Sequence, residues 1–421
     1  MEMYELNCGK IKLDGKWWLG HDGSKQISLL PPLQRIARVG TPFIRAPGSE
    51  EKVMRIAQVA PLYESVPPKK YGGTERVVSY LTEELVTQGH DVTLFASGDS
   101  ITSARLVAPC TEALRLSEAC VDPLPHHVLM LEMLSQAAGE FDAIHFHCDY
   151  IHFPLARRRR LPNVTTMHGR LDLPDIVSLF REFMEMPVIS ISDSQRTPVP
   201  WLNWQGTVYH GLPVDLYQFN RQGGRYLAFL GRICPEKGIE QAVEIATRTE
   251  IPLRVSAKVD RADKDYFNDV VQPLFKNPLI EFVGEISESE KNEFLGNAMA
   301  LLTPINWPEP FGMVMIEAMA CGTPVIAFRH GSVPEVVEEG RSGLIVSTVE
   351  QAVAAIRKGS LPGRQSCRER FERRFTAPRM AQDYLAIYKR LAECSSSIAA
   401  IESESASDPE ENAPWTMTSS A

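Results

Sequence analysis

Residues 308–327 read P-E-P-F-G-M-V-M-I-E-A-M-A-C-G-T-P-V-I-A. Between Phe311 and Cys321 the one charged residue is Glu317, so we expect a helix over about 312–321 that is buried nearly all round. A buried carboxylate carries a desolvation cost of several kcal/mol unless a partner compensates it. The position of Glu317 therefore predicts a partner, which could be a core arginine or the hydroxyl pair of a sugar.

The residues at the start of this helix suit a ligand. Gly312 carries no side chain, so a ligand can approach the backbone, and the unpaired amides of Met313 and Val314 would face an anion. Glu309 precedes them in a loop between two prolines. It can present a carboxylate at the mouth of a cleft, while Glu317 would lie deeper.

Segments typical of strands and helices alternate on both sides of this stretch. Short apolar runs at 54–60 and 226–231 are typical of strands in a buried parallel sheet. We expect one helix to start at Thr74 as its N-cap and another to cover 263–276. The alternation predicts two doubly wound α/β domains that face a central cleft. The expected division is an N-terminal extension at 1–52, a first domain at 53–220, a second domain at 221–376, a closing helix at 377–394 and a disordered tail at 395–421.

Composition excludes several classes of protein. The 421 residues carry 44 basic and 53 acidic side chains and a net charge of −9, which argues against a nucleic-acid partner. The eight cysteines are scattered, and no apolar run approaches the ~18 residues of a membrane span. The basic run 157–160 is typical of a solvated helix end, so membrane contact would be at most peripheral. The start of the sequence lacks a signal-peptide pattern, and we expect a cytoplasmic location.

Two cations follow the first strand of the second domain. Residues 231–238 read G-R-I-C-P-E-K-G, which puts Arg232 and Lys237 at a strand-to-helix turn where phosphates bind in such sheets. The alternative is a pair of solvated surface cations with Glu236 as their partner.

Two features of the first domain should lie at the same cleft. Gly73 precedes the first helix and would let the backbone approach a diphosphate, although such glycines are more often part of a turn. His168 ends a predicted strand, although a lone histidine is usually structural. More histidines lie between 142 and 152, but no carboxylate or thiol completes a site, so we predict no bound metal.

The chain resembles glycosyltransferase family 4, the retaining enzymes of the GT-B fold. The resemblance rests on residues 308–327, which carry the E-x7-E element of the family as Glu309 and Glu317. Four shorter motifs accompany it: G-R-I-C-P-E-K-G, Y-G-G-T-E, H-G in the first domain, and V-Y-H-G-L-P-V-D at 208–215. The resemblance to the family spans about residues 54–394.

The resemblance implies a role for each site residue. Arg232 and Lys237 would bind the donor diphosphate, and Glu317 the ribose hydroxyls. Glu309 would hold sugar hydroxyls and His168 would lie beside the transferring sugar, so the catalytic set would be His168, Glu309, Arg232 and Lys237. The other donor-binding residues would be Gly73, Val283, Gly284, Phe311, Gly312, Met313 and Val314, with Val283 and Gly284 beside the base.

The expected function is that of a metal-independent hexosyltransferase without a cofactor. It would move a sugar, with retention, from a nucleotide diphosphate-sugar to a small-molecule, glycan or lipid acceptor that the sequence does not identify, and UDP-sugar is the donor we expect. A GT-B nucleotide-sugar 2-epimerase and a non-catalytic sugar-nucleotide binding protein are the alternatives. Lys258 stands where the family often has a glycine-rich turn. This lysine adds a cation near the diphosphate or alters the base pocket.

Overall fold

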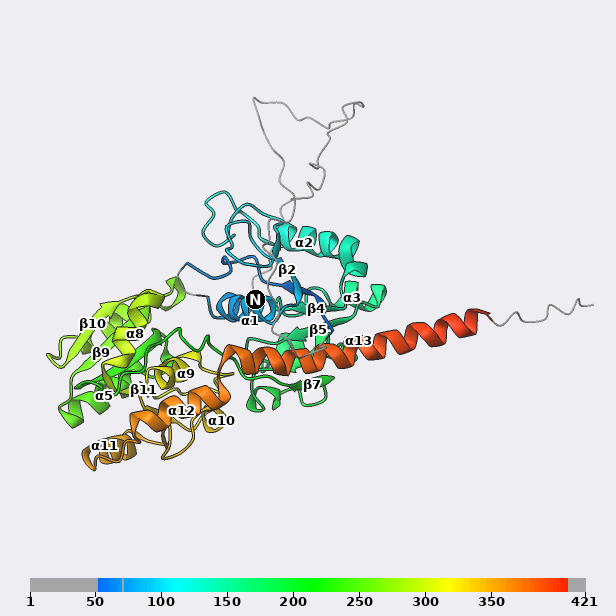
Figure 1. Cartoon of the computed structure of the whole chain (residues 1–421). Helices are drawn as coiled ribbons and strands as arrows, with labels where there is room; N and C mark the ends of the chain where they lie inside the picture. The colour runs from blue at the N-terminus through cyan, green and yellow to red at the C-terminus, as the bar shows by residue number, and fades with distance from the viewer. Residues whose placement is uncertain (1–51, 70–71, 408–421) are drawn as a thin grey trace, which may run out of the picture. The chain divides into compact units, whose positions relative to one another are not determined.

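The computed structural model describes the backbone of residues 52–69 and 72–407 and the side chains of these residues up to Glu393 (Figure 1). The expected N-terminal extension at 1–52 lies outside the described residues except for Lys52. The same is true of the last part of the expected tail, 408–421.

The first domain is built on a sheet of seven parallel strands in the order β3-β2-β1-β4-β5-β6-β7. Buried apolar side chains of the strands, such as Ile56 and Ile144, explain why this sheet forms the centre of the domain. The strands are β1 (Arg55–Val59), β2 (Asp91–Phe95), β3 (Arg105–Val107), β4 (Ala143–Phe146), β5 (Asn163–Thr166), β6 (Val188–Ser190) and β7 (Trp204–Thr207). The α-helices between them are α1 (Gly73–Thr87), α2 (Leu124–Ala137), α3 (Phe153–Arg159) and α4 (Pro174–Glu182).

The second domain repeats this plan with six parallel strands in the order β10-β9-β8-β11-β12-β13. The strands are β8 (Tyr226–Arg232), β9 (Leu253–Lys258), β10 (Ile280–Gly284), β11 (Ala298–Thr303), β12 (Val325–Phe328) and β13 (Gly343–Val346). Its main helices are α5 (Ile239–Thr249), α8 (Glu288–Gly296), α9 (Met313–Ala320), α10 (Val333–Val336), α11 (Val349–Arg357) and α12 (Arg364–Arg374). Two doubly wound domains are therefore present, as the alternation predicts.

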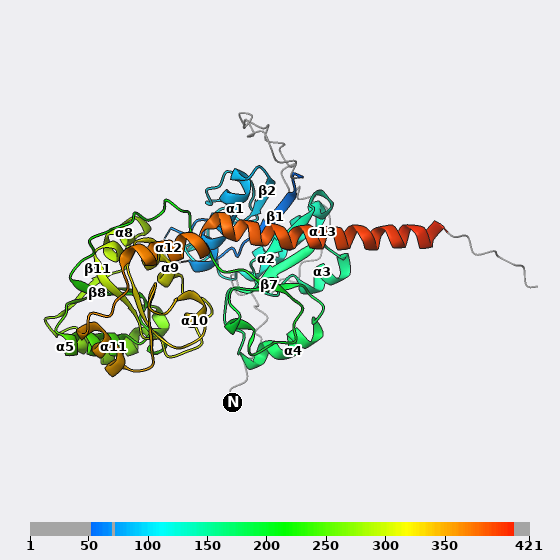
Figure 2. The ribbon, with the colours of Figure 1, turned by 60° about the horizontal axis from the view of Figure 1, so that its bottom comes forward.

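The last helix, α13 (Ala377–Ser407), returns to the first domain. Met380, Tyr384 and Tyr388 are wholly buried in one cluster with Ile56 of β1 and Leu81 of α1. Figure 2 shows α13 running past α1 and β7. The sheet of the first domain is thus covered by a helix that follows the second domain in sequence.

Three expectations about single elements need correction. Helix α1 begins at Gly73 after an N-cap at Gly72, so Thr74 does not cap it. The helix predicted over 263–276 is present but shorter and irregular: α6 (Lys264–Tyr266), a π-helical segment (Phe267–Val271) and α7 (Gln272–Leu274) follow one another without a gap, and Pro273 lacks the amide that a regular α-helix needs.

The third correction concerns the end of the last helix. The closing helix does not end at 394, because α13 continues to Ser407 into the expected tail. Extending an existing helix by good helix formers such as Ala399 and Glu402 costs far less than starting a new one.

Candidate functional site

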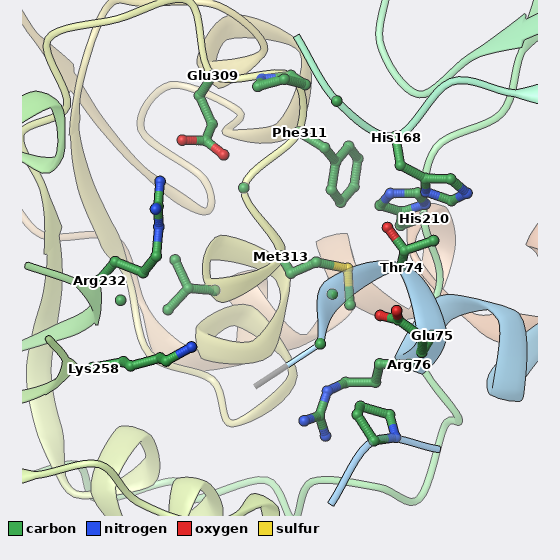
Figure 3. Close-up of a pocket in the computed structure, with 18 of the residues that line it drawn as sticks. Thr74, Glu75, Arg76, His168, His210, Arg232, Lys258, Glu309, Phe311 and Met313 are labelled. Atoms are coloured by element: carbon green, nitrogen blue, oxygen red, sulfur yellow. The ribbon is translucent and has the colours of Figure 1, made fainter. Parts of the chain in front are cut away.

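A cavity of about 1050 Å³ lies where the carboxyl ends of the strands of both domains point. Loops after β1, β4 and β5 line it from the first domain, and loops after β8, β9 and β11 from the second. Figure 3 shows Arg232 and Lys258 on one wall, with Glu75 and Arg76 opposite them. This is the place at which open α/β sheets bind their ligands.

Most predicted site residues meet at this cavity. Those that line it are His168, Glu309, Arg232, Lys237, Gly73, Phe311, Gly312, Met313, Val314 and Glu317. Val283 and Gly284 are not among the lining residues, whereas the next two residues, Glu285 and Ile286, are. Val283 packs against the core of the second domain, and Gly284 sits at an irregularity of β10 with φ of +78°.

Helix α9 carries Glu317 into the interior beside the cavity. Its N-cap, Gly312, has φ of +80°, a conformation that favours glycine, and a Cβ there would lie 2.6 Å from the Met315 methyl group. The Glu317 side chain is 4% exposed, and its Oε1 lies 2.9 Å from Nζ of Lys291. The partner that Glu317 requires is thus a lysine of α8, and neither a core arginine nor a sugar is needed to compensate its burial.

Sequence reasoning missed Lys291. The pattern Ser287-x-x-Glu290 is a capping box and could have placed the start of α8 and hence the first turn that carries Lys291. No local pattern connects that turn with Glu317, because the two residues belong to separate helices. Lys291 also lies 3.3 Å from Glu288, so one ammonium group serves two carboxylates.

Glu309 is held by two donors from its own domain. The Lys237 ammonium forms an ion pair with Glu309 Oε2, and Nε1 of Trp307 donates a hydrogen bond of 2.8 Å to the same oxygen. The backbone is fixed as well, because a Cβ at Gly331 would lie 2.4 Å from the Glu309 nitrogen. Two residues to which the resemblance gives separate roles, a phosphate cation and a sugar-binding carboxylate, are therefore in direct contact.

Two cations stand side by side at the ends of β8 and β9. Arg232 and Lys258 are paired in the register of the two strands, and both line the cavity. The Asp260 carboxylate lies 2.8 Å from Lys258 and 3.4 Å from Arg232. Burial alone would raise the pKa of Asp260, but the two cations outweigh it and hold that pKa below its ordinary value. Lys258 therefore adds a second cation beside Arg232 at this end of the cavity.

The first turn of α1 forms the opposite wall. A Cβ built on Gly73 meets no atom within 4 Å, so the protein itself does not require glycine at this position. Arg76, one turn further on, forms an ion pair with Glu288 of α8. The space beside Gly73 at the start of α1 is therefore open on the side of the cavity.

His168 lies at the end of the cavity near Phe311 and His210 (Figure 3). Its ring stacks on that of His210 with a centroid separation of 5.3 Å, and its Nε2 lies 2.9 Å from Nδ1 of His147. Burial lowers the pKa of His168 to about 3, so the ring is neutral at ordinary pH. Within residues 52–69 and 72–407, no group of three or more histidine, cysteine or acidic side chains could hold a metal ion.

Comparison with protein families gives two matches. The model described as "Glycosyl transferases group 1" matches residues 218–366, and the model described as "Glycosyltransferase Family 4" matches residues 71–197. Together they take in about two thirds of the chain, one model in each domain.

Curated relatives are similar over most of the chain. A glycogen synthase of Mycobacterium tuberculosis is 25% identical over 396 residues, which cover 79% of this chain and 95% of that protein. A phosphatidyl-myo-inositol mannosyltransferase of Mycolicibacterium smegmatis is 26% identical over 328 residues, covering 70% of this chain and 81% of that protein. In the part of the chain that the structure describes, no helix is long and apolar enough to cross a membrane.

Solved structures share the fold. Sucrose-phosphate synthase of Thermosynechococcus elongatus superposes with a TM-score of 0.67 at 20% identity and covers 81% of this chain and all of that one. HepE of Anabaena in complex with UDP-glucose gives a TM-score of 0.60 at 17% identity, covering 82% of this chain and all of that one. The expected fold class and the family resemblance are confirmed. The chain belongs to glycosyltransferase family 4 and is a glycosyltransferase of the GT-B fold.

Proposed function

We propose that the protein transfers a hexose, with retention at the anomeric carbon, from a nucleotide diphosphate-sugar to an acceptor held mainly by the first domain. The observation that carries the proposal is the set of cations at one end of the cavity: Arg232, Lys237 and Lys258 all line it beside the start of α9. A diphosphate is the ligand whose charge this set would neutralise.

The proposed chemistry is stabilisation of the leaving group. As the anomeric C–O bond breaks, negative charge builds on the β-phosphate, and preorganised cations and helix amides lower that barrier. Lys237 would turn from Glu309 to the phosphate, while Glu309 holds hydroxyls of the sugar. Because the ion pair with Lys237 and the hydrogen bond from Trp307 both engage the Glu309 carboxylate, it is a poor nucleophile. This favours a front-face route in which the leaving phosphate assists deprotonation of the acceptor.

The same wall supports transfer without a metal ion or another cofactor. Arg232, Lys237 and the amides of Met313 and Val314 would supply the positive charge that a divalent cation supplies elsewhere. UDP-sugar is the donor we propose, and the solved HepE structure was determined with UDP-glucose. Glu317 would bind the ribose hydroxyls of that donor, with Lys291 keeping its carboxylate charged.

The test is to incubate the protein with UDP-, GDP- and ADP-glucose, and with UDP-galactose and GDP-mannose, and to measure release of the nucleoside diphosphate. We expect slow release from one UDP-sugar, and the same rate after excess EDTA. Release from a GDP- or ADP-sugar would correct the base, and activity lost on chelation but restored by Mn²⁺ would contradict metal independence. Formation of an epimeric sugar, or binding of every nucleotide without any release, would overturn the proposal of sugar transfer.

A further inference from the structure

A chain of buried side chains connects α13 with His168. Nε2 of Gln58 on β1 donates a hydrogen bond of 3.1 Å to the Tyr388 hydroxyl of α13. Its Oε1 lies 2.8 Å from Nε2 of His147, and Nδ1 of His147 lies 2.9 Å from Nε2 of His168. Gln58, His147 and Tyr388 are at most 2% exposed, so no water competes for these contacts.

The orientation of the Gln58 amide sets the direction of every bond in the chain. Its carbonyl oxygen can only accept, so the facing nitrogen of His147, Nε2, must carry the proton. A neutral imidazole has a single N–H, which leaves Nδ1 of His147 as an acceptor. Nε2 of His168 then has to be the donor, and Nδ1 of His168 carries no proton.

The far end of the chain agrees with this direction. Having accepted from Gln58, the Tyr388 hydroxyl has one proton to donate, and Nδ1 of His145 lies 2.7 Å away. His145 Nε2 is then protonated and lies 2.7 Å from the Thr166 hydroxyl. Burial lowers the pKa values of His145, His147 and His168, so the chain consists of neutral groups.

The chain leaves Nδ1 of His168 as an unused acceptor beside the cavity. Nδ1 of His168 is buried and has no hydrogen-bond partner among the described residues. His168 lines the cavity from the turn that follows β5, and the ring of His210 contacts both His168 and Phe311. A hydroxyl group of a ligand is the donor that would satisfy a bare nitrogen in this position.

We infer that Gln58, His147 and Tyr388 are positioning residues that hold His168 in the tautomer with a bare Nδ1, so that it accepts a hydrogen bond from a hydroxyl of the transferred sugar. This inference rests on the proposed function for the identity of the ligand. It assigns to His147, one of the buried histidines between 142 and 152, a part in orienting the donor sugar.

The first measurement is the tautomer of His168, read from the ring ¹⁵N chemical shifts of histidine-labelled protein and assigned with a His168→Asn variant. We expect a protonated Nε2 and a bare Nδ1 in the wild-type protein. In Gln58→Leu the direction is no longer imposed, and we expect a mixture of tautomers or the reversed one. In Gln58→Glu the carboxylate still accepts from His147, so we expect the wild-type tautomer to be restored.

The second measurement is kinetic and uses the sugar nucleotide that proves active. We expect Gln58→Leu to lower kcat about tenfold, with affinity for the nucleoside diphosphate unchanged within twofold, and Gln58→Glu to recover most of the loss. Thr165→Val is the matched control, because it removes a buried hydrogen bond from a neighbouring strand of the same sheet, β5, to His152 without touching the chain.

A proton on Nδ1 of wild-type His168, or an unchanged tautomer in Gln58→Leu, would overturn the inference, and so would an equal loss of kcat in Thr165→Val. The tautomer measurement needs no substrate, so it gives its answer even if no sugar nucleotide reacts. A failure of every sugar nucleotide to react would count against the proposed function alone. If Gln58→Leu does not fold, Tyr388→Phe removes the group that fixes the Gln58 amide and takes its place in both measurements.

Discussion

The two walls of the cavity hold their polar groups in different ways. The wall of the second domain is ionic, and its cations are paired with carboxylates: Lys237 with Glu309, Lys291 with Glu317, and Arg232 with Asp260. The wall of the first domain around His168 is made of neutral, buried histidines in hydrogen-bonded contact. An ionic wall can exchange a carboxylate partner for a phosphate, whereas a neutral chain has one fixed pattern of donors and acceptors. The second domain is therefore suited to neutralising charge, and the first to orienting hydroxyl groups.

Acid should destabilise the first domain more than the second, and this is the largest effect we expect. Burial lowers the pKa values of five histidines, all in the first domain: His145, His147, His152, His168 and His210. Their unfolded forms bind a proton below about pH 6.5 and their folded forms do not, so stability is full above that pH and is lost as the pH falls. Between pH 6.5 and 5.5 the loss should reach about 5 kcal/mol.

Thermal unfolding at pH 7.5, 6.5 and 5.5, together with hydrogen exchange read by mass spectrometry, checks this. Peptides of the first domain should lose protection first. The second domain, residues 221–376, contains a single histidine, His330, and serves as the internal control. An unfolding temperature that does not change between pH 7.5 and 5.5 would contradict the neutral histidine cluster.

Removing a cation from the ionic wall should have the next largest effect. Arg232→Ala and Lys237→Ala should each lower kcat/KM by about two to three orders of magnitude, because each removes one donor to the developing phosphate charge. Arg248→Ala is the control, since Arg248 pairs with Glu244 and Glu350 on the surface of the same domain. Initial rates measured with the active donor test this prediction. Activity within threefold of wild type in both site variants would show that these residues do not bind the donor.

The ion pair inside this wall should also matter for stability. Lys291→Met leaves the buried Glu317 without its 2.9 Å partner and should lower the free energy of unfolding by about 2–3 kcal/mol. Arg248→Met breaks exposed pairs and should cost about 1 kcal/mol or less. Urea unfolding at pH 7.5 measures both. Equal losses in the two variants would mean that Glu317 is stabilised by something other than Lys291.

The smallest effect concerns the backbone of the first-domain wall. Gly73→Ala should keep or slightly raise the unfolding temperature, since the new Cβ meets no protein atom and alanine favours a helix. It should raise the KM for the donor about fivefold, because the methyl group would occupy space next to the diphosphate. Gly139→Ala adds a methyl group at another open position, away from the cavity, and should change neither quantity. If the KM for the donor is equal in the two variants, Gly73 does not lie next to the bound donor.

The fold could be predicted from local patterns wherever apolar residues alternate with turns. The apolar runs at 54–60 and 226–231 form β1 (Arg55–Val59) and β8 (Tyr226–Arg232), and α9 at Met313–Ala320 lies within the expected helix. Helix α12 was missed because its sequence, R-Q-S-C-R-E-R-F-E-R-R, has only two buried side chains, Cys367 and Phe371. Its place is fixed by arginines such as Arg364, which donates to the carbonyl groups of Gly296 and Ala298, and no local pattern predicts such bonds.

The residues of the candidate site likewise fall into those that could be predicted from local sequence and those that could not. Arg232, Glu309 and Glu317 could be found because their charges stand out in apolar or turn segments next to strand ends. Lys291, Gln58 and Tyr388 could not, since each acts through a residue far away in the sequence: Tyr388 meets Gln58 across 330 positions. Sequence therefore indicates which residues could face the ligand, and tertiary packing decides which residues hold them.

We propose that, on the ionic wall, Glu317 binds the nucleotide of the donor and Glu309 binds its sugar. Calorimetric titration of Glu317→Gln and Glu309→Gln with the nucleoside diphosphate of the active donor tests it most directly. Glu317→Gln should weaken binding by about 10- to 100-fold, the worth of a hydrogen bond to a charged group. Glu309→Gln should leave binding unchanged or slightly tighter, because it releases Lys237 for the phosphate. Loss of nucleotide affinity in Glu309→Gln, with Glu317→Gln unaffected, would contradict the placement of nucleotide and sugar in the cavity.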